Sequence, residues 1–159
     1  ENDLGDFKTF LKLSPPLRLE NDRIGLVEGI KSGLIDVIVS DHTPEDEESK
    51  RLPFAQAATG AIGIETLLPL ALEMYHNESL TLSKIIETLT INPAKILKIH
   101  KGTLKKGSEA DICVFDLNKP WIVSANNLKS KSKNSAIEGR KLQGKVFMTF
   151  LNGELVFKS

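Results

Sequence analysis

The spacing of apolar residues changes once in the first third of the chain. Between residues 22 and 32 they recur near the helical period, with Asp22 as a good N-cap and Gly33 suited to the position after the last turn, so a helix is predicted there. Residues 34–39 are a β-branched run that is apolar on both faces, as in a parallel strand covered by helices. The run ends in Ser40-Asp41-His42-Thr43-Pro44, polar residues at the end of the strand where parallel α/β folds gather their chemistry.

Helical patterns continue to about residue 100. Residues 45–60 are polar and predict a long loop over that same strand end. Three helices are predicted after it: one from a cap near Thr66 to about Asn77, one over residues 82–89 opened by Thr81 or Ser83, and a short one from Asn92 through Leu97.

The pattern becomes β-like after His100. Residues 111–116 and 121–123 read as strands, and residues 145–157 read as a hairpin around a type I′ turn at Asn152-Gly153. We therefore expect two zones: residues 1–100 as an incomplete α/β layer, and residues 101–159 as a small β module.

One parallel strand cannot form a stable sheet, because neighbouring strands must pair its N–H and C=O groups. The missing strands are expected to come from elsewhere. The chain also begins at Glu1 without Met, in a polar segment. It is therefore expected to be the carboxyl half of a barrel or doubly wound protein, or to be completed by a partner.

Composition narrows the class of protein. The 159 residues carry 21 Lys and Arg against 21 Asp and Glu, and a net charge of zero argues against a nucleic-acid binder. The single Cys113 cannot form an internal disulfide, which fits a reducing compartment. No apolar run approaches the ~20 residues that a membrane helix needs. Residues 1–6 contain no targeting pattern, so a cytoplasmic protein without membrane contact is expected.

Asp41-His42 is the sharpest local signal for chemistry. A carboxylate at a strand end can bind a divalent metal and exchange a proton with a water on it, as metal-assisted hydrolysis needs. Asp41 can equally cap the following turn, and His42 fits a structural role better than a ligand role. Three scattered histidines and one cysteine cannot assemble a zinc site of three or four ligands. Any metal would need ligands from outside this sequence.

Other polar residues have simpler readings. The acidic run Glu45-Asp46-Glu47-Glu48 is expected to be a solvated loop. Lys50-Arg51 could hold an anionic substrate, but beside four carboxylates they are expected to form surface ion pairs. Arg18, fixed by the preceding Pro15-Pro16, is a candidate for anion binding or a surface pair. Thr59-Gly60 offers backbone N–H groups that could face a ligand, or simply makes a turn.

Several strings in order along the whole chain resemble the carboxyl-terminal part of dihydroorotases of the amidohydrolase superfamily. They are Lys12-Leu13-Ser14-Pro15-Pro16-Leu17-Arg18, Ser40-Asp41-His42-Thr43-Pro44, Lys50-Arg51-Leu52-Pro53-Phe54-Ala55, the segment from Gly60 to Leu70, Asn92-Pro93-Ala94, the segment from Gly102 to Ile112, Ser132-Lys133-Asn134, and the closing Gly144-Lys145-Val146 with Asn152-Gly153.

The resemblance implies a fold and an activity. Its fold is α/β, the last units of a metal-dependent hydrolase (β/α)₈ TIM barrel plus a small β-sandwich, and its reaction interconverts carbamoyl-aspartate and dihydroorotate in pyrimidine biosynthesis. Asp41 matches the aspartate that binds metal and moves the proton; Ser14, Glu45, Thr59 and Gly60 fall where the family contacts substrate. Two zinc ions are implied for the full-length protein and none for this chain alone, because the His-x-His pair and the other ligands lie upstream.

Two departures keep alternatives open. Glu45 stands where the family usually has a His that helps hold the substrate carboxylate, and Ser14 stands in place of an Asn. The first alternative is an inactive dihydroorotase-like subunit that scaffolds aspartate transcarbamoylase. The second is hydrolysis of another cyclic ureide, such as a hydantoin or allantoin. Expected partners are the small-molecule substrate, the missing amino-terminal barrel half and a second copy in a homodimer, and the chain alone is expected to be inactive.

Overall fold

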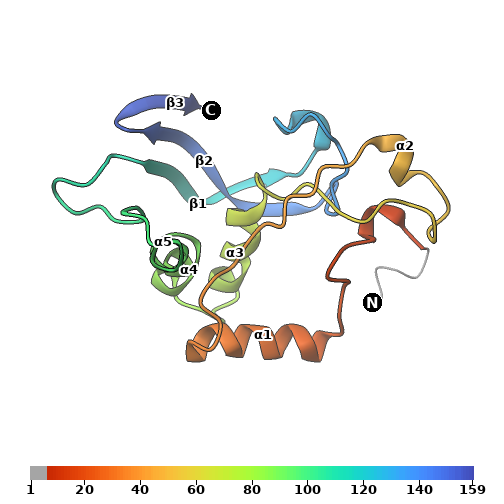
Figure 1. Cartoon of the computed structure of the whole chain (residues 1–159), viewed down its shortest axis with the longest axis horizontal. Coiled ribbons are helices and arrows are strands. Elements are labelled where there is room, and N and C mark those ends of the chain that lie inside the picture. Colours follow the sequence, from red (N-terminus) through yellow and green to blue (C-terminus); the bar gives the residue numbers. More distant parts are fainter. Residues whose placement is uncertain (1–6) are drawn as a thin grey trace. The chain divides into compact units, whose positions relative to one another are not determined.

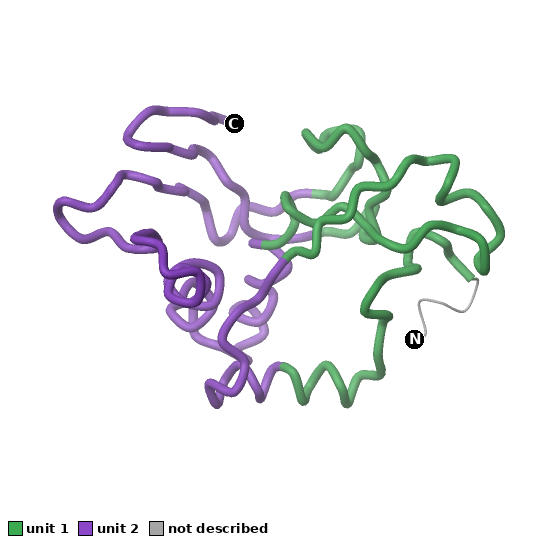
Figure 2. The backbone as a smooth tube through the Cα atoms, viewed as in Figure 1, with its two compact units in different colours: residues 1–26, 40–67, 122–141 green, residues 27–39, 68–121, 142–159 purple. Residues whose placement is uncertain are grey.

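A computed structural model describes residues 7–159 of the chain. Two compact units are present, coloured separately in Figure 2. The first unit comprises the described part of residues 1–26 together with residues 40–67 and 122–141. The second unit comprises residues 27–39, 68–121 and 142–159. The prediction that no targeting pattern occurs at the amino end concerns residues 1–6, which lie outside the described residues.

Four helices account for most of the helical structure (Figure 1). They are α1 (Glu20–Ser32), α3 (Leu67–His76), α4 (Leu82–Leu89) and α5 (Ile91–Leu97). The apolar faces of α1, α3 and α4 contribute to the core of the second unit, because burial of aliphatic side chains is the main stabilising term in folding. This core consists of Val27, Ile30, Ala71, Leu80 and Ile85, with Ile35, Ile38, Met74 and Leu89 packed against it. No helix within residues 7–159 has the length and apolar character needed to cross a bilayer.

The ends of α1 correct one detail of the prediction. The helix begins at Glu20 rather than near residue 22, because Asp22 lies in the first turn and its Oδ2 accepts the N–H of Leu19 at 3.1 Å. Asp22 therefore satisfies a free N–H from inside the helix instead of serving as the N-cap. At the other end Gly33 has a φ of 81°, as predicted for the residue that follows a last turn.

The other helices begin at or within one residue of the predicted positions, since α5 begins at Ile91 rather than at Asn92. Leu67 is the first residue of α3, directly after Thr66, and the helix ends at His76. The choice between Thr81 and Ser83 is resolved for α4, since Thr81 is the N-cap and its Oγ1 accepts the N–H of Lys84 at 3.3 Å. The short helix predicted through Leu97 is α5.

A three-stranded sheet in the order β1-β2-β3 follows, made of β1 (Ile112–Ile122), β2 (Lys141–Leu151) and β3 (Glu154–Lys158). The two predicted strands at residues 111–116 and 121–123 are joined in the single strand β1. The hairpin prediction is confirmed, since Leu151 pairs with Glu154 in antiparallel β2 and β3. Asn152 and Gly153 both have positive φ, 50° and 83°, as a type I′ turn requires.

The predicted strand at residues 34–39 is wrong for the chain as described. No segment within residues 7–159 forms a β-ladder with it, and the backbone N–H of Ile38 bonds instead to the carbonyl of Thr88 at 3.3 Å. Leu34 and Val39 are 83% and 73% exposed. An apolar run acquires strand geometry only when a neighbour pairs its backbone groups, and the described residues provide none.

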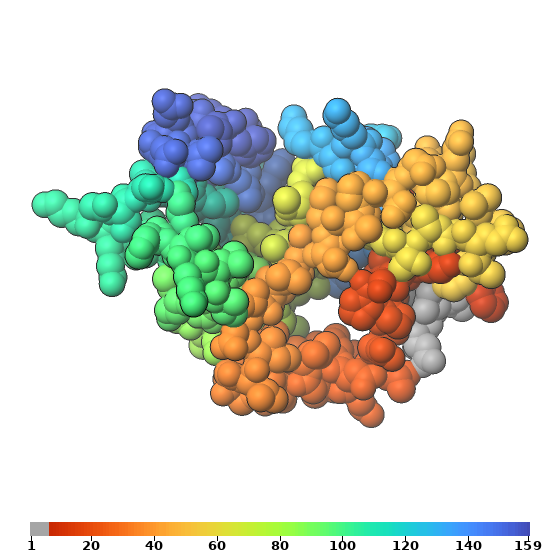
Figure 3. Space-filling view, in the orientation of Figure 1, coloured from red at the N-terminus to blue at the C-terminus, as the bar shows by residue number. Residues whose placement is uncertain are grey.

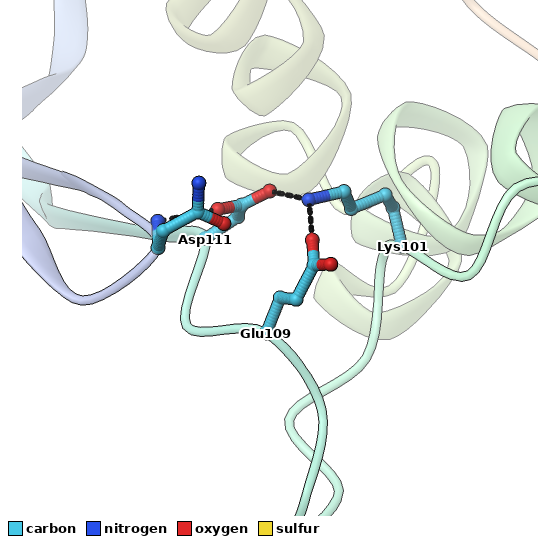
Figure 4. A network of polar contacts seen from close by, with 4 residues as sticks. Lys101, Glu109 and Asp111 are labelled. Atoms are coloured by element: carbon cyan, nitrogen blue, oxygen red, sulfur yellow. Dashed lines mark hydrogen bonds and ion pairs between the residues drawn. The ribbon is translucent and has the colours of Figure 1, made fainter.

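The segment between α5 and β1 is fixed at its base by a polar network. The ammonium of Lys101 lies between the carboxylates of Glu109 and Asp111 (Figure 4), and Asp111 also accepts the N–H of Asn152 at 2.8 Å. The bond from Asn152, followed by that from Lys101, lowers the pKa of Asp111. Beyond this base the segment projects from the surface around it, as its teal atoms show in Figure 3, and Leu104 is 83% exposed.

The first unit has little regular structure. Besides residues 20–26 of α1, it contains α2 (Glu47–Lys50) and two short 3₁₀ turns, Thr9–Leu11 and Ala125–Asn127, joined by extended segments. Its buried residues include Ala57, Ile62, Val123 and Leu128. Polar contacts between segments far apart in the sequence supply much of its order, and these contacts surround the candidate site.

Candidate functional site

A buried lysine lies at the centre of the first unit. Helix α2 begins after Asp46, whose Oδ1 accepts the N–H of Ser49 at 2.7 Å, and ends at Lys50. The Lys50 residue is fully buried, and its Nζ donates to the carbonyl oxygens of Lys12 at 3.3 Å, Ala58 at 2.9 Å and Gly60 at 3.0 Å. The prediction of a surface ion pair is therefore wrong for Lys50. It is confirmed for Arg51, which pairs with Glu47 on the surface.

The surroundings of Lys50 affect its protonation. Burial disfavours the charged form and lowers the pKa of Lys50, and the nearby ammonium of Lys12 acts in the same direction. The negative charge of Glu45 opposes this and raises the pKa of Lys50. The Lys50 ammonium can remain inside the unit because its three N–H donors each find a carbonyl oxygen.

Lys12 repeats this arrangement close by. Its Nζ donates to the carbonyl oxygens of Phe54, Ala55 and Ala57 at 2.9, 3.1 and 2.8 Å and lies 5.6 Å from the centre of the Phe54 ring. Unlike Lys50, the Lys12 residue is only partly buried. The acidic run is also more ordered than predicted, because part of it forms α2.

Asp41 begins the turn after the predicted strand. Its φ is 43°, in the left-handed region that Asp tolerates better than most residues. The residue is exposed. The next residue, His42, forms a parallel bridge with Ala61, and the N–H of Thr43 donates to the Ala61 carbonyl at 2.9 Å. The backbone after Asp41 is thus held beside the segment that follows Gly60.

Two glycines allow this close approach. A Cβ on Gly60 would lie 2.6 Å from Cγ2 of Thr43, and Gly60 also has a φ of 137°. A Cβ on Gly63 would lie 2.7 Å from the carbonyl oxygen of Ser40. No side chain fits at either distance, so the sequence needs glycine at both positions for the two segments to lie together.

His42 has a structural contact here. Its Nδ1 accepts the N–H groups of Gly63 at 3.1 Å and Ile64 at 3.3 Å. Because Nδ1 is the acceptor, a neutral ring carries its proton on Nε2. The ring holds residues 63 and 64 beside the Asp41 turn, in line with the structural role that the sequence favoured.

A later segment of the chain completes the frame. The buried Nδ2 of Asn134 donates to the carbonyls of Thr43 at 3.2 Å and Gly60 at 3.3 Å, while its Oδ1 is buried without a hydrogen-bond partner among the described residues. The Glu65 carboxylate accepts the N–H groups of Lys129 and Ser130, each at 3.0 Å. Residues 128–134 are thereby held against residues 43–65.

The predicted site residues lie on segments that this frame links. Gly60 is buried, and its N–H donates to the carbonyl of Lys12 at 2.9 Å, two residues before Ser14. Ser14 and Thr59 are exposed, while Glu45 is half-buried and its carbonyl accepts the Ser132 hydroxyl. The frame connects the backbone of these segments, and among the described residues no hydrogen bond or ion pair joins Asp41 to Ser14, Glu45, Thr59 or Gly60.

Lys50 and Asn134 are the residues that sequence reasoning missed. Both lie inside strings that carry the family resemblance, yet the sequence favours a surface ion pair for Lys50 and suggests no role for Asn134. A lysine next to four acidic residues has the composition of a surface pair, and only the fold reveals that its ammonium points inward. The signal available in the sequence was that both residues lie in those strings, as Gly60 and Gly63 also do.

The side chains of this site can supply at most one ligand to a metal ion. Asp41 offers an exposed carboxylate on a constrained turn, which suits a divalent cation. Within residues 7–159 no three His, Cys, Asp or Glu side chains are grouped so that they could hold a metal ion. A metal at Asp41 would therefore draw its other ligands from outside the described residues.

Relatives of known name match the chain over nearly its full length. It is 44% identical over 159 residues to a protein named dihydroorotase from Ehrlichia chaffeensis, covering 100% of this chain and 36% of that protein. A protein of the same name from Aquifex aeolicus is 46% identical over 147 residues, 92% of this chain and 35% of that protein. The chain thus spans about a third of the curated relatives it matches, and the dihydroorotase resemblance is confirmed.

Solved structures named hydantoinase or dihydropyrimidinase are also similar to the chain. An L-hydantoinase (dihydropyrimidinase) from Arthrobacter aurescens matches 99% of this chain and 36% of that chain with a TM-score of 0.87 and 34% identity. A dihydropyrimidinase from Brevibacillus agri matches 97% of this chain and 35% of that chain with a TM-score of 0.88 and 25% identity. Residues 12–156 also match the amidohydrolase family. With an α/β structure and relatives that match from end to end, the chain belongs to the amidohydrolase family.

Proposed function

We propose that the protein of which this chain forms a part is a dihydroorotase, which interconverts carbamoyl-aspartate and dihydroorotate by hydrolysing and re-forming a cyclic amide. The carrying observation is the identity of about 45% to proteins named dihydroorotase along essentially the whole chain. The exposed carboxylate of Asp41, held on a turn by residues 60–64, supports this reading. In this proposal the substrate is a small molecule and the reaction belongs to pyrimidine biosynthesis.

The proposed architecture follows from the same relatives. Residues 1–100 supply the last units of a (β/α)₈ barrel, and residues 101–159 supply part of a β-sandwich. The exposed apolar residues of the segment at 34–39 fit a strand that needs neighbours from the rest of the protein. The sheet of β1, β2 and β3 is the part of the sandwich that this chain contributes.

Asp41 is the proposed catalytic residue and metal ligand. We propose that the metal is zinc and that two ions are bound. Such a divalent metal would supply Lewis-acid activation of the attacking water. The Asp41 carboxylate accepts the proton of that water and returns it to the ring nitrogen that leaves.

Ser14, Glu45, Thr59 and Gly60 are the proposed substrate contacts. Ser14 and Thr59 are exposed and carry hydroxyl groups that can donate to or accept from a substrate carboxylate or ring amide. Glu45 is the exception, since its charge would repel a carboxylate. The negative charge of Glu45 also acts on Lys50, where it partly opposes the lowering of the Lys50 pKa by burial.

Asp41→Asn in the whole protein tests the proposal. The amide has nearly the same size but cannot accept the proton, so turnover of dihydroorotate should fall by at least about a hundredfold. The thermal unfolding midpoint should stay close to that of the wild type, because the Asp41 residue is exposed. Turnover is measured in both directions of the reaction, with the metal content of each preparation recorded.

Asp36→Asn is the matched control. It makes the same chemical change five residues earlier, at another exposed aspartate, and should leave turnover within about threefold of the wild type. Equal turnover by Asp41→Asn and Asp36→Asn would reject the role of Asp41. A wild-type protein that hydrolyses no dihydroorotate would reject the proposed activity itself.

Hydrolysis of another cyclic ureide is the second candidate. It is favoured by the match to the L-hydantoinase (dihydropyrimidinase) at a TM-score of 0.87 and 34% identity, together with Glu45 in the proposed substrate region. Comparing kcat/KM for dihydroorotate, a hydantoin and allantoin separates the two candidates. A protein that turns over none of them, yet binds aspartate transcarbamoylase, would instead be the scaffold subunit that Glu45 also favours.

A further inference from the structure

We infer that Lys50 is a positioning residue, which fixes the backbone carrying the candidate substrate contacts although its own side chain reaches no substrate. This inference rests on the proposed function for its kinetic consequence. It adds to that function a residue that supports the backbone of the site, in addition to the residues proposed to contact the substrate.

The geometry around Lys50 carries the inference. Its ammonium has three N–H donors, and all three are used on the carbonyls of Lys12, Ala58 and Gly60, between 2.9 and 3.3 Å. The acceptors belong to two segments far apart in sequence from one another. An ammonium that is fully buried between them fixes their separation, because any movement would leave a buried donor or carbonyl without a partner.

The anchored carbonyls flank the candidate residues. Ala58 and Gly60 lie on either side of Thr59, and Lys12 lies two residues before Ser14. The two segments are also joined directly, since the N–H of Gly60 donates to the carbonyl of Lys12 at 2.9 Å. A shift of Lys50 would therefore move both proposed contact segments together.

Asn134 extends this frame to the Asp41 turn. The Gly60 carbonyl accepts from both Lys50 and Asn134, and Asn134 also donates to the carbonyl of Thr43. Gly60 is thus the point at which the ammonium, the amide and the Asp41 turn are connected. The cost of burying a charge is offset here by contacts that specify one backbone arrangement, whereas an apolar side chain of similar length would leave the carbonyls unpaired.

The test compares Lys50→Met with Lys12→Met in the whole protein. Both replacements remove an ammonium that donates to three carbonyls, but the Lys12 side chain holds residues 54–57 rather than residues 58–60. Lys50→Met should raise KM for dihydroorotate about tenfold or more with kcat changed less, because misplaced contacts weaken binding. Lys12→Met should change KM by less than about threefold.

Hydrogen exchange supplies a readout that does not depend on activity. The amides to follow are those of Gly60 and Thr43, which donate to Lys12 and Ala61. Their exchange should be about tenfold faster in Lys50→Met and nearly unchanged in Lys12→Met. If the wild type hydrolyses no cyclic amide, the proposed function fails, and the exchange of these two amides alone decides whether Lys50 fixes this backbone.

Three results would overturn the inference. Equal exchange at Gly60 in the two variants would show that Lys50 does not hold this segment. Faster exchange without a change in KM, in an active enzyme, would make Lys50 a structural residue only. If Lys50→Met does not fold, Lys50→Gln, which keeps an amide donor, replaces it; loss of fold in both, with Lys12→Met folded, would reject a role limited to positioning.

Discussion

Gly60 shows at the scale of one residue why the site depends on backbone contacts. Its carbonyl accepts from two buried side chains, its N–H donates to Lys12, and its α-carbon faces Thr43 too closely for a side chain. A residue with those three constraints has little freedom to vary. Its replacement should affect stability in addition to any effect on the substrate contact proposed for it.

Gly60→Ala should therefore be strongly destabilising. The added Cβ would lie 2.6 Å from Cγ2 and 3.1 Å from the carbonyl oxygen of Thr43. The φ of 137° adds strain of about 1–3 kcal/mol for a residue other than glycine, and the close contact adds a similar amount. The measurement is the thermal unfolding midpoint of the whole protein with and without the substitution.

Two other glycines separate the effect of backbone strain from the effect of the close contact. Gly107 has a φ of 89° with no atom within 4 Å of its Cβ position, so Gly107→Ala has the strain without the clash. Gly25, inside α1, has neither, and Gly25→Ala should stabilise by roughly 0.5–1 kcal/mol. A Gly60→Ala midpoint no lower than that of Gly107→Ala would contradict the close approach to Thr43.

Elements, at the next scale, divide into those that close their own hydrogen bonds and those that do not. Helix caps and the Asn152-Gly153 turn are determined by neighbouring residues, so α3, α4, α5 and the β2–β3 hairpin could be predicted from the sequence. The strand at residues 34–39 could not, because its partners lie elsewhere in sequence. The apolar pattern of that segment predicts that its side chains prefer burial, but it does not supply a neighbouring strand to pair with its backbone.

Thr81→Ala tests the cap of α4. The Thr81 hydroxyl accepts the N–H of Lys84 at 3.3 Å, and its loss should cost about 1 kcal/mol of stability. Ser83→Ala is the matched control, since it removes a hydroxyl two residues later, which donates to the carboxylate of the exposed Glu87 at 3.3 Å. It should be neutral or slightly stabilising, because Ala favours helix. Equal unfolding midpoints for the two variants would contradict Thr81 as the cap.

At the scale of the whole molecule, the candidate site illustrates the limit of sequence reasoning. The turn at Asp41 and the glycines were identified from local pattern, whereas Lys50 and Asn134 were not, because their roles depend on acceptors 8 to 91 residues away. The residues around Lys50 predict a charge on the surface. In the structure Lys50 is buried, and its ammonium joins two segments of the chain. Residues that act by joining distant segments are visible only after folding.

Residues 1–159 produced alone should bind no zinc stoichiometrically and hydrolyse no dihydroorotate. The reason is that no three suitable side chains are grouped within residues 7–159, so Asp41 would stand without further ligands. Metal content after dialysis is the measurement, with the whole protein dialysed in parallel. Retention of one zinc ion per chain by residues 1–159 would contradict the proposed division of ligands.

The bond between Asn134 and Thr43 also sets an order of events on the ribosome. These residues are 91 positions apart, and at about 5–20 residues per second the later one is made roughly 5–20 s after the earlier. Throughout that interval the carbonyl of Thr43 must rely on water in place of the amide. Translation therefore has to pass Asn134 before the turn after Asp41 can reach its final form, and a transcript that ends sooner yields a product in which that turn is never closed.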